Sequence, residues 1–367
     1  MKGQLSNGAA ALSCLESYFG SLPDPRAANA THRLGDLIVM MIAASLCGAS
    51  TATEFALFAA QRKQALSRLI DYDVAPSHDT FSRLLRLLDP DAFAKAFAAF
   101  AAGFASACQQ EDGVIALDGK ALRRAYEKGL AASPPLTVSA FASETRRCLA
   151  VASPRAGENE VDTALKLVEL IDLAGRTVTA DALHCHARMA EAVIAKGGDY
   201  LLALKGNRRL WLASATRHLA AGSPAVAEHS QTSHGRSEWR KAEVVATTEL
   251  LVSGLKAYVR ITSRRDEARP QARLFMASTL LSPQRALDLT RAHWQIENSL
   301  HWMLDVHFDE DLSRARKDNA PANTALINRI ARNILQAADT EKVPIRHRIK
   351  KCAWNDDYLI NAITHMR

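Results

Sequence analysis

The sequence has few of the features that place a chain among secreted, zinc-binding or membrane proteins. Its six cysteines are scattered and form no CxxC pair, so neither a disulfide framework nor a zinc site is indicated and reduced thiols are expected. The longest apolar run, residues 37–47, is shorter than the roughly 20 residues that cross a bilayer and predicts a buried helix. The first residues hold one lysine and no sustained apolar stretch, unlike a secretory signal. We therefore expect a cytoplasmic protein with no membrane partner.

Length and charge narrow the class further. The chain has 367 residues, 48% of them hydrophobic, which is enough for a sizeable core and about two or three structural units. Its net charge of +7 is a modest bias toward a polyanionic partner. Between residues 314 and 367 there are eleven lysines and arginines against five acidic residues. This basic tail indicates either contact with phosphates or a solvated helical face, and charge alone leaves both open.

Sequence patterns change along the chain. Periodic segments rich in alanine and leucine, with Ser77 or Asp79 as a possible cap, predict an all-helical domain over residues 1–110. Short apolar runs with one helix at residues 159–173 predict an α/β core, formed by residues 111–207 and 282–335. Between these halves, residues 208–281 hold three strand-like stretches, at 242–252, 257–265 and 272–281, and a helix resumes near Ser282. Residues 336–367 form a basic C-terminal segment.

Two aspartates end predicted strands, and a glutamate lies far along the chain. Asp118 ends the apolar run that begins at Val114, and Asp181 ends the run that begins at Thr177. A lone aspartate at such a place is commonly a turn or cap residue. Glu297 lies beside an apolar stripe of helical spacing, at the edge of a buried face. The stripe consists of Leu289, His293, Ile296, Leu300 and Leu304. Three converging carboxylates repel one another unless a cation neutralises them, and Mg²⁺ prefers oxygen ligands, so this set predicts phosphoryl transfer.

Eight short strings are spread over nearly the whole chain. They are LPDPR (22–26), HDTFSR (78–83), ALDGKALR (116–123), ENE (158–160), TADAL (179–183), YLLALKGN (200–207), HGRSE (234–238) and HWQIENSLHWMLDVHFDED (293–311). In these strings and their order the chain resembles the H-repeat-associated insertion-sequence transposases, a branch of the DDE transposases. One such string would be weak, whereas eight in order make the resemblance specific.

The resemblance implies a fold, a site and an activity. The fold would be a ribonuclease-H-like mixed-sheet core with a β-rich insertion, preceded by the helical domain. Asp118, Asp181 and Glu297 would be the catalytic residues and would hold two Mg²⁺ or Mn²⁺ ions. The enzyme would cut element ends and join 3′-hydroxyls to target DNA, with double-stranded DNA as its partner. It would act as a homodimer on DNA in the bacterial cytoplasm, associated with the nucleoid, and the helical domain would bind element ends or pair protomers.

Candidate DNA contacts are less specific, because a basic residue at such a place could equally be an ordinary surface cation. They are Lys120, Arg123, Lys205, Arg236, Arg291, His293, His301 and Arg314. DDE transposases outside this branch carry Tyr, Arg and Lys around the glutamate, whereas the corresponding positions here hold Thr290, His293 and Leu304. DNA contacts near the glutamate are therefore expected to use other residues.

Several alternatives stay open at this point. Asp309 could replace Glu297 as third ligand in a different helix register, and Asp305, Glu310 and Asp311 are further acids nearby. The HCH string that begins at His184 offers metal-ligand residues, but neighbouring residues do not easily chelate one zinc ion, so a helix start is favoured. The chain could also be a host-retained transposase descendant that binds or cuts DNA without mobility. A carboxylate-pair hydrolase such as a glycosidase would instead act without metal.

Overall fold

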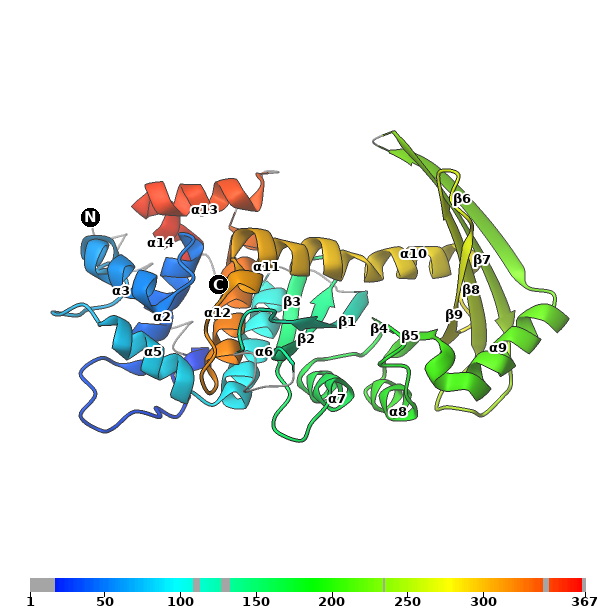
Figure 1. Ribbon diagram of the computed structural model, residues 1–367, viewed down its shortest axis with the longest axis horizontal. Helices are drawn as coiled ribbons and strands as arrows, with labels where there is room; N and C mark the ends of the chain where they lie inside the picture. Colours follow the sequence, from blue (N-terminus) through cyan, green and yellow to red (C-terminus); the bar gives the residue numbers. More distant parts are fainter. Residues whose placement is uncertain (1–16, 108–112, 127–132, 234, 339–342, 365–367) are drawn as a thin grey trace.

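The protein is an α/β molecule, as the sequence predicts. A computed structural model describes residues 17–107, 113–126, 133–233, 235–338 and 343–364 (Figure 1). Within these ranges one mixed sheet runs through the molecule, and helices cover both of its faces. A group of helices packs at one end of the molecule. No helix among these residues is both long and apolar enough to cross a membrane. The described cysteines, Cys47, Cys148, Cys185 and Cys352, are free thiols, whereas Cys14 and Cys108 lie outside the described residues.

The described part of the N-terminal region is helical. Its helices are α2 (Leu34–Leu46), α3 (Ala52–Gln61), α4 (Lys63–Leu66), α5 (His78–Leu87) and α6 (Pro90–Ala107). The apolar run that was expected to form a buried helix is α2, and nearly all of its side chains are buried. Of the two candidate caps, Ser77 begins α5, because its hydroxyl accepts a hydrogen bond from the Thr80 N–H.

The strands form a single nine-stranded sheet in the described residues, in the order β3-β2-β1-β4-β5-β9-β8-β7-β6. Strands β1, β4 and β5 are parallel, and every other neighbouring pair is antiparallel. The bounds are β1 Val114–Ala121, β2 Leu136–Ala142, β3 Arg147–Ala152, β4 Thr177–Ala180, β5 Asp199–Leu204, β6 Ala225–Ser233, β7 Arg236–Ala246, β8 Ala257–Arg265 and β9 Gln271–Ala277. Because β9 pairs with β5, the strands of the expected insertion extend the sheet rather than form a separate one.

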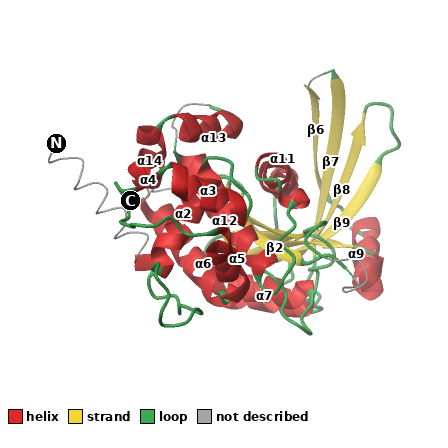
Figure 2. Cartoon of the chain, turned by 60° about the vertical axis from the view of Figure 1, so that its left-hand side comes forward, coloured by secondary structure: helices red, strands yellow, loops and turns green. Residues whose placement is uncertain are grey.

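The region 208–281 differs in detail from its sequence pattern. It begins with a helix, α9 (Arg209–Ala221), and a strand, β6, and neither was predicted. The strand expected at 242–252 was placed too late, since β7 begins at Arg236 and ends at Ala246. Its polar half, from Arg236 to Lys241, pairs with β6, and from Glu238 onward it also pairs with β8. A strand of polar residues shows no alternation of apolar and polar side chains. The sequence pattern therefore could not predict this part of the strand. Figure 2 shows β6 to β9 rising away from the helices.

Two layers of helices cover the sheet, and alternate residues of β1 face opposite layers. Leu117 packs with residues of α7 (Glu160–Leu170), α8 (Ala187–Ala195) and α9. Ala116 lies on the other face, in one core with residues of the π-helix, α11 and α12, which belong to the segment from α10 to α12. That segment comprises α10 (Pro283–His293), a π-helix (Ile296–His301), α11 (Trp302–His307) and α12 (Ala320–Ala337), and Ser282 caps α10 as expected. Short 3-10 turns lie at Gly206–Arg208 and Glu310–Leu312.

The C-terminal helices α13 (Ile345–Trp354) and α14 (Asp356–Thr364) pack in the same core as α2. The basic segment 314–367 has fewer exposed cations than its residue count indicated, because Arg329, Arg332 and Arg348 are buried. Arg329 pairs with Glu310, and Arg332 and Arg348 donate to backbone carbonyls. These three side chains hold the core together and cannot reach DNA phosphates.

Candidate active site

Asp118 and Asp181 lie side by side on neighbouring parallel strands. The last paired residues of β1 and β4 are Leu117 and Ala180, so the two aspartates occupy the next position on each chain. Adjacent strands are about 4.8 Å apart, so the backbones of the two aspartates are neighbours in the sheet. Asp181 follows β4 directly, as predicted. Asp118 does not end its strand, since β1 continues to Ala121 through pairing with β2.

Asp181 also has the ordinary role that its position indicated. Its Oδ1 accepts hydrogen bonds from the N–H of Leu183 at 2.9 Å and of His184 at 3.4 Å. This turn holds the carboxylate in a fixed orientation after the strand. The turn role and a site role are therefore compatible.

Glu297 approaches from the helical layer above β1. It lies in the π-helix between α10 and α11, where the Trp302 N–H donates to the Glu297 carbonyl five residues earlier. Ile296 and Leu300 are fully buried in one core with Ala116, whereas Glu297 itself is exposed beside them. The sequence predicted a helix edge here, and the π-helical turn is an addition that is frequent at functional sites.

The charges of Asp181 and Glu297 act on the pKa of Asp118. Burial, followed by the charges of Asp181 and Glu297, raises the pKa of Asp118 to about 7, against an opposing hydrogen bond from the Gly119 N–H. Such like-charge crowding favours a cation, and an all-oxygen donor set suits Mg²⁺ or Mn²⁺. As the side chains stand, no three His, Cys, Asp or Glu residues in the described ranges form a metal-binding group. The donor chemistry nevertheless fits a divalent ion.

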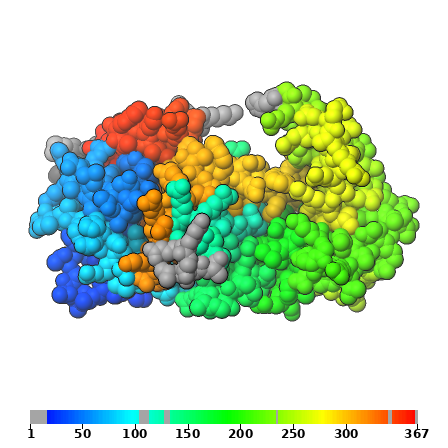
Figure 3. All heavy atoms as spheres, in the orientation of Figure 1, coloured from blue at the N-terminus to red at the C-terminus, as the bar shows by residue number. Residues whose placement is uncertain are grey.

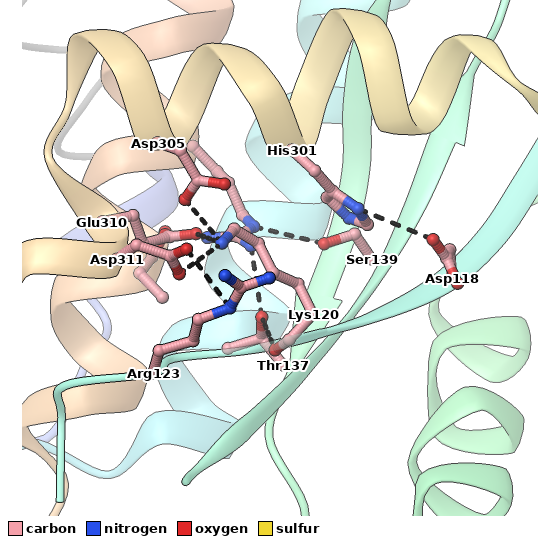
Figure 4. A network of polar contacts seen from close by, with 11 residues as sticks. Asp118, Lys120, Arg123, Thr137, Ser139, His301, Asp305, Glu310 and Asp311 are labelled. Carbon is pink, nitrogen blue, oxygen red and sulfur yellow. Dashed lines mark hydrogen bonds and ion pairs between the residues drawn. The ribbon is translucent and has the colours of Figure 1, made fainter.

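The two histidines proposed as DNA contacts are part of the interior. His301 Nδ1 lies 3.5 Å from Asp118 Oδ2 (Figure 4), and burial lowers the pKa of His301 to about 3. His293 Nδ1 lies 3.0 Å from the Thr179 hydroxyl, and burial lowers its pKa to about 4. Both rings are neutral at physiological pH, so neither serves as a cationic phosphate contact.

Two positions near the glutamate that differ from other DDE transposases make their contacts within the protein. The Thr290 hydroxyl donates to carbonyls of its own helix, and Leu304 is fully buried. Neither offers a surface for DNA.

Lys120 was a candidate DNA contact, but the structure buries it in an ion-pair network. Its side chain is 8% exposed, and its Nζ lies 2.6 Å from Asp305 and 3.0 Å from Asp311 (Figure 4). Glu310 is only 2% exposed and pairs with Arg329 at 2.7 Å. The rival acids of this segment are therefore neutralised by protein cations, and Lys120 joins β1 to α11 instead of facing phosphate.

Asp309 lies apart from these contacts. It is an exposed residue in left-handed conformation (φ 51°) at the turn that precedes the 3-10 helix at Glu310. The HCH string has the helix-start role that was favoured, since His186 Nδ1 accepts a hydrogen bond from the Arg188 N–H at the start of α8. His184 pairs with Glu160, a residue that the sequence reasoning did not single out, although it stands in the ENE string.

The remaining basic candidates stay at the surface. Arg123 is 78% exposed and lies 3.5 Å from Asp311, and Arg291 donates to Gln231. Lys205, Arg236 and Arg314 are exposed. Arg236 begins β7 at the far end of the β6–β7 hairpin, and Figure 3 shows the surface hollowed between this hairpin and α13. These five residues remain candidates for phosphate contact.

Comparison with known proteins agrees with the geometry. Residues 110–334 match the family described as Transposase DDE domain, and residues 16–101 match the family described as DDE_Tnp_1-associated. The chain is 28% identical to the H repeat-associated putative transposase YhhI of Escherichia coli K12, covering 95% of this chain and 97% of the relative. It is 30% identical to the putative transposase YncI of Escherichia coli O157:H7, covering 94% and 93%.

A solved piggyBac transposase synaptic complex with hairpin DNA is a more distant match. It has a TM-score of 0.45 and 11% identity, over 95% of this chain and 80% of that one, which is too remote to indicate function. The two Escherichia coli relatives match over nearly the whole length, and the family model for the transposase DDE domain matches more than half of this chain. The chain belongs to the DDE transposase domain family, among its H-repeat-associated transposases.

Proposed function

We propose that this transposase cuts DNA at the ends of an insertion sequence and joins the released 3′-hydroxyls to target DNA. Asp118, Asp181 and Glu297 would hold two Mg²⁺ or Mn²⁺ ions. The observation that carries the proposal is the placement of Asp118 and Asp181 at the next position after the pair Leu117 and Ala180, with Glu297 in the helical layer above. The raised pKa of Asp118 supports it, because a buried carboxylate beside two others favours a bound cation.

The strand order supports a ribonuclease-H-like core. Three antiparallel strands, β3-β2-β1, continue into the parallel strands β4 and β5, with one acid on β1 and one directly after β4. In this proposal residues 111–207 and 282–335 form the core, and 208–281 is its β-rich insertion, which prolongs the sheet through β9.

Each residue of the proposed site would have a separate role. The carboxylates of Asp118 and Asp181 would stand at one end of a shared site because their strands are fixed by the sheet, and the turn at Leu183 would keep Asp181 oriented. Neutral His301 would support Asp118 without competing as a cation. Metal ions in such a site activate water or a 3′-hydroxyl and stabilise the departing oxygen. Hydrolysis and strand transfer would then share one site.

DNA would be held by surface cations away from the acids. Arg236 at the start of β7 and Arg291 on α10, which donates to Gln231 of β6, would make part of this contact, and the exposed Lys205, Arg123 and Arg314 would extend it. We further propose that residues 1–110 recognise element ends or pair protomers, in a homodimer on DNA. Because α2 shares its core with α12, α13 and α14, deletion of this region would unfold the protein, so surface substitutions are the suitable test.

The test is DNA cleavage by variants that keep side-chain shape and remove one charge each. Asp118→Asn, Asp181→Asn and Glu297→Gln should fold and bind DNA, whereas cleavage should fall by roughly 10³-fold or more because metal positioning is lost. Asp309→Asn is the matched control, since it alters an exposed acid of the same segment. A folded Asp309→Asn protein without activity, together with an active Glu297→Gln protein, would move the third ligand to Asp309.

The competing hypotheses are separable. Membership of the transposase family leaves the glycosidase hypothesis without support. A host-retained descendant would keep the acidic site, so inverted repeats in the flanking DNA would distinguish it from a mobile element.

A further inference from the structure

Gly119, the residue after Asp118, leaves space for a fourth carboxylate. A Cβ atom at this position would lie 2.2 Å from Glu160 Oε1 and 2.6 Å from its Cδ, far inside van der Waals contact. Gly119 does not have a positive φ, so its backbone conformation is open to any residue. Glycine therefore lets the Glu160 carboxylate lie against the strand beside Asp118, and a side chain at this position would displace that carboxylate.

The same carboxylate reaches the turn that holds Asp181. Glu160 Oε1 accepts a hydrogen bond from His184 Nε2 at 3.1 Å, and the His184 side chain is fully buried. The His184 backbone N–H donates in turn to Asp181 Oδ1. Glu160 thus contacts β1 next to one aspartate and, through His184, the turn of the other.

The start of α7 keeps Glu160 in this place. Asn159 caps the helix, and its side chain and that of Asp162 exchange hydrogen bonds with each other's backbone N–H. An acid in the first turn is favoured by the helix dipole alone. The dipole does not explain why the Glu160 carboxylate lies against Gly119 and His184. These two contacts indicate a role for Glu160 beyond the stability of the helix.

We propose that Glu160 is a positioning residue, whose carboxylate sets the spacing between β1 at Asp118 and the turn at Asp181. This inference rests on the proposed metal-dependent function of the two aspartates. Glu160 need not bind an ion itself, because it acts through Gly119 and His184. Residues that orient ligands in this way typically change metal affinity or activity by about 10–100-fold when they are altered.

The test uses Glu160→Ala, Glu160→Gln and Gly119→Ala in the full-length protein, with Glu169→Gln as the control on an exposed part of the same helix. Two quantities are measured: the Mg²⁺ concentration that gives half-maximal cleavage of end DNA, and the rise in melting temperature caused by Mg²⁺ without DNA. We expect Glu160→Ala to need about 10-fold more Mg²⁺ in both assays. Glu160→Gln should stay within about 3-fold of wild type, because its amide oxygen still accepts from His184.

The double variant Gly119→Ala, Glu160→Ala makes the test sharper. Gly119→Ala alone should weaken Mg²⁺ binding about 10-fold by displacing the carboxylate, and the double variant should be no worse than Glu160→Ala, because nothing remains to be displaced. The proposal would be overturned if the double variant needed more Mg²⁺ than Glu160→Ala, by the product of the two single effects. A folded Glu160→Ala protein with wild-type Mg²⁺ dependence would also overturn it. If Glu160→Ala does not fold, wild-type Mg²⁺ dependence in Gly119→Ala would overturn it equally. Cleavage by wild type without metal would overturn the proposed function instead.

Discussion

Asp118→Asn should stabilise the metal-free protein although it removes an acid of the proposed active site. Burial, followed by the charges of Asp181 and Glu297, raises the pKa of Asp118 from 3.8 to about 7. The side chain is 21% exposed, so solvent screens these effects only in part. A rise of this size corresponds to about 4 kcal/mol of unfavourable free energy in the folded protein when the carboxyl is ionised.

Proton linkage gives the pH dependence of this effect. Above pH 3.8 the unfolded chain releases the proton of Asp118, whereas the folded protein keeps it until its pKa of about 7. Wild type therefore loses stability as the pH rises from about 4 to about 7, and the loss is complete above that range. Asparagine does not titrate, but burial of its amide costs part of the gain, so we expect the variant to be about 2–3 kcal/mol more stable near pH 8.

Urea unfolding in EDTA measures this difference at about pH 5 and about pH 8. The advantage of Asp118→Asn should be smaller at the lower pH, and Mg²⁺ should reduce it at the higher pH by stabilising wild type alone. Asp309→Asn, which changes an exposed acid in a left-handed turn that asparagine tolerates, should unfold like wild type. Equal unfolding free energies for wild type and Asp118→Asn near pH 8 would refute the raised pKa of Asp118, and with it the unfavourable burial and like-charge repulsion that a bound cation is proposed to relieve.

Three further outcomes are expected. Excess EDTA should abolish DNA cleavage, and Ca²⁺ should support binding with little chemistry because its looser coordination misplaces the nucleophile; full cleavage in EDTA would contradict this. Lys120→Met should lower the free energy of unfolding by about 2–3 kcal/mol, since Asp305 and Asp311 lose their cation, while the salt dependence of DNA binding stays the same; a changed salt dependence would return Lys120 to the DNA surface. Arg236→Ala should reduce the slope of log affinity against log salt by about 1, and an unchanged slope would remove the hairpin from the DNA contact.

The sequence by itself determined the local features of this protein. The buried helix α2, the cap at Ser77 and the restart of helix at Ser282 follow from apolar periodicity and capping residues within a few positions of one another. The positions of Asp118 and Asp181 at or near strand ends were visible for the same reason. The order of eight strings identified the family, and with it the three acids expected to act together.

Tertiary structure alone decided which charged residues are exposed and which are buried in ion pairs. Lys120 meets Asp311, 191 positions along the chain, and Arg329 meets Ser139 at a separation of 190, so no local pattern could show that both are buried. The pairing of β9 with β5 and the approach of Glu160 to Gly119 are likewise contacts between distant segments. A charge in the sequence has the same appearance whether its partner is water, phosphate or a buried carboxylate, and only the folded chain brings that partner into contact.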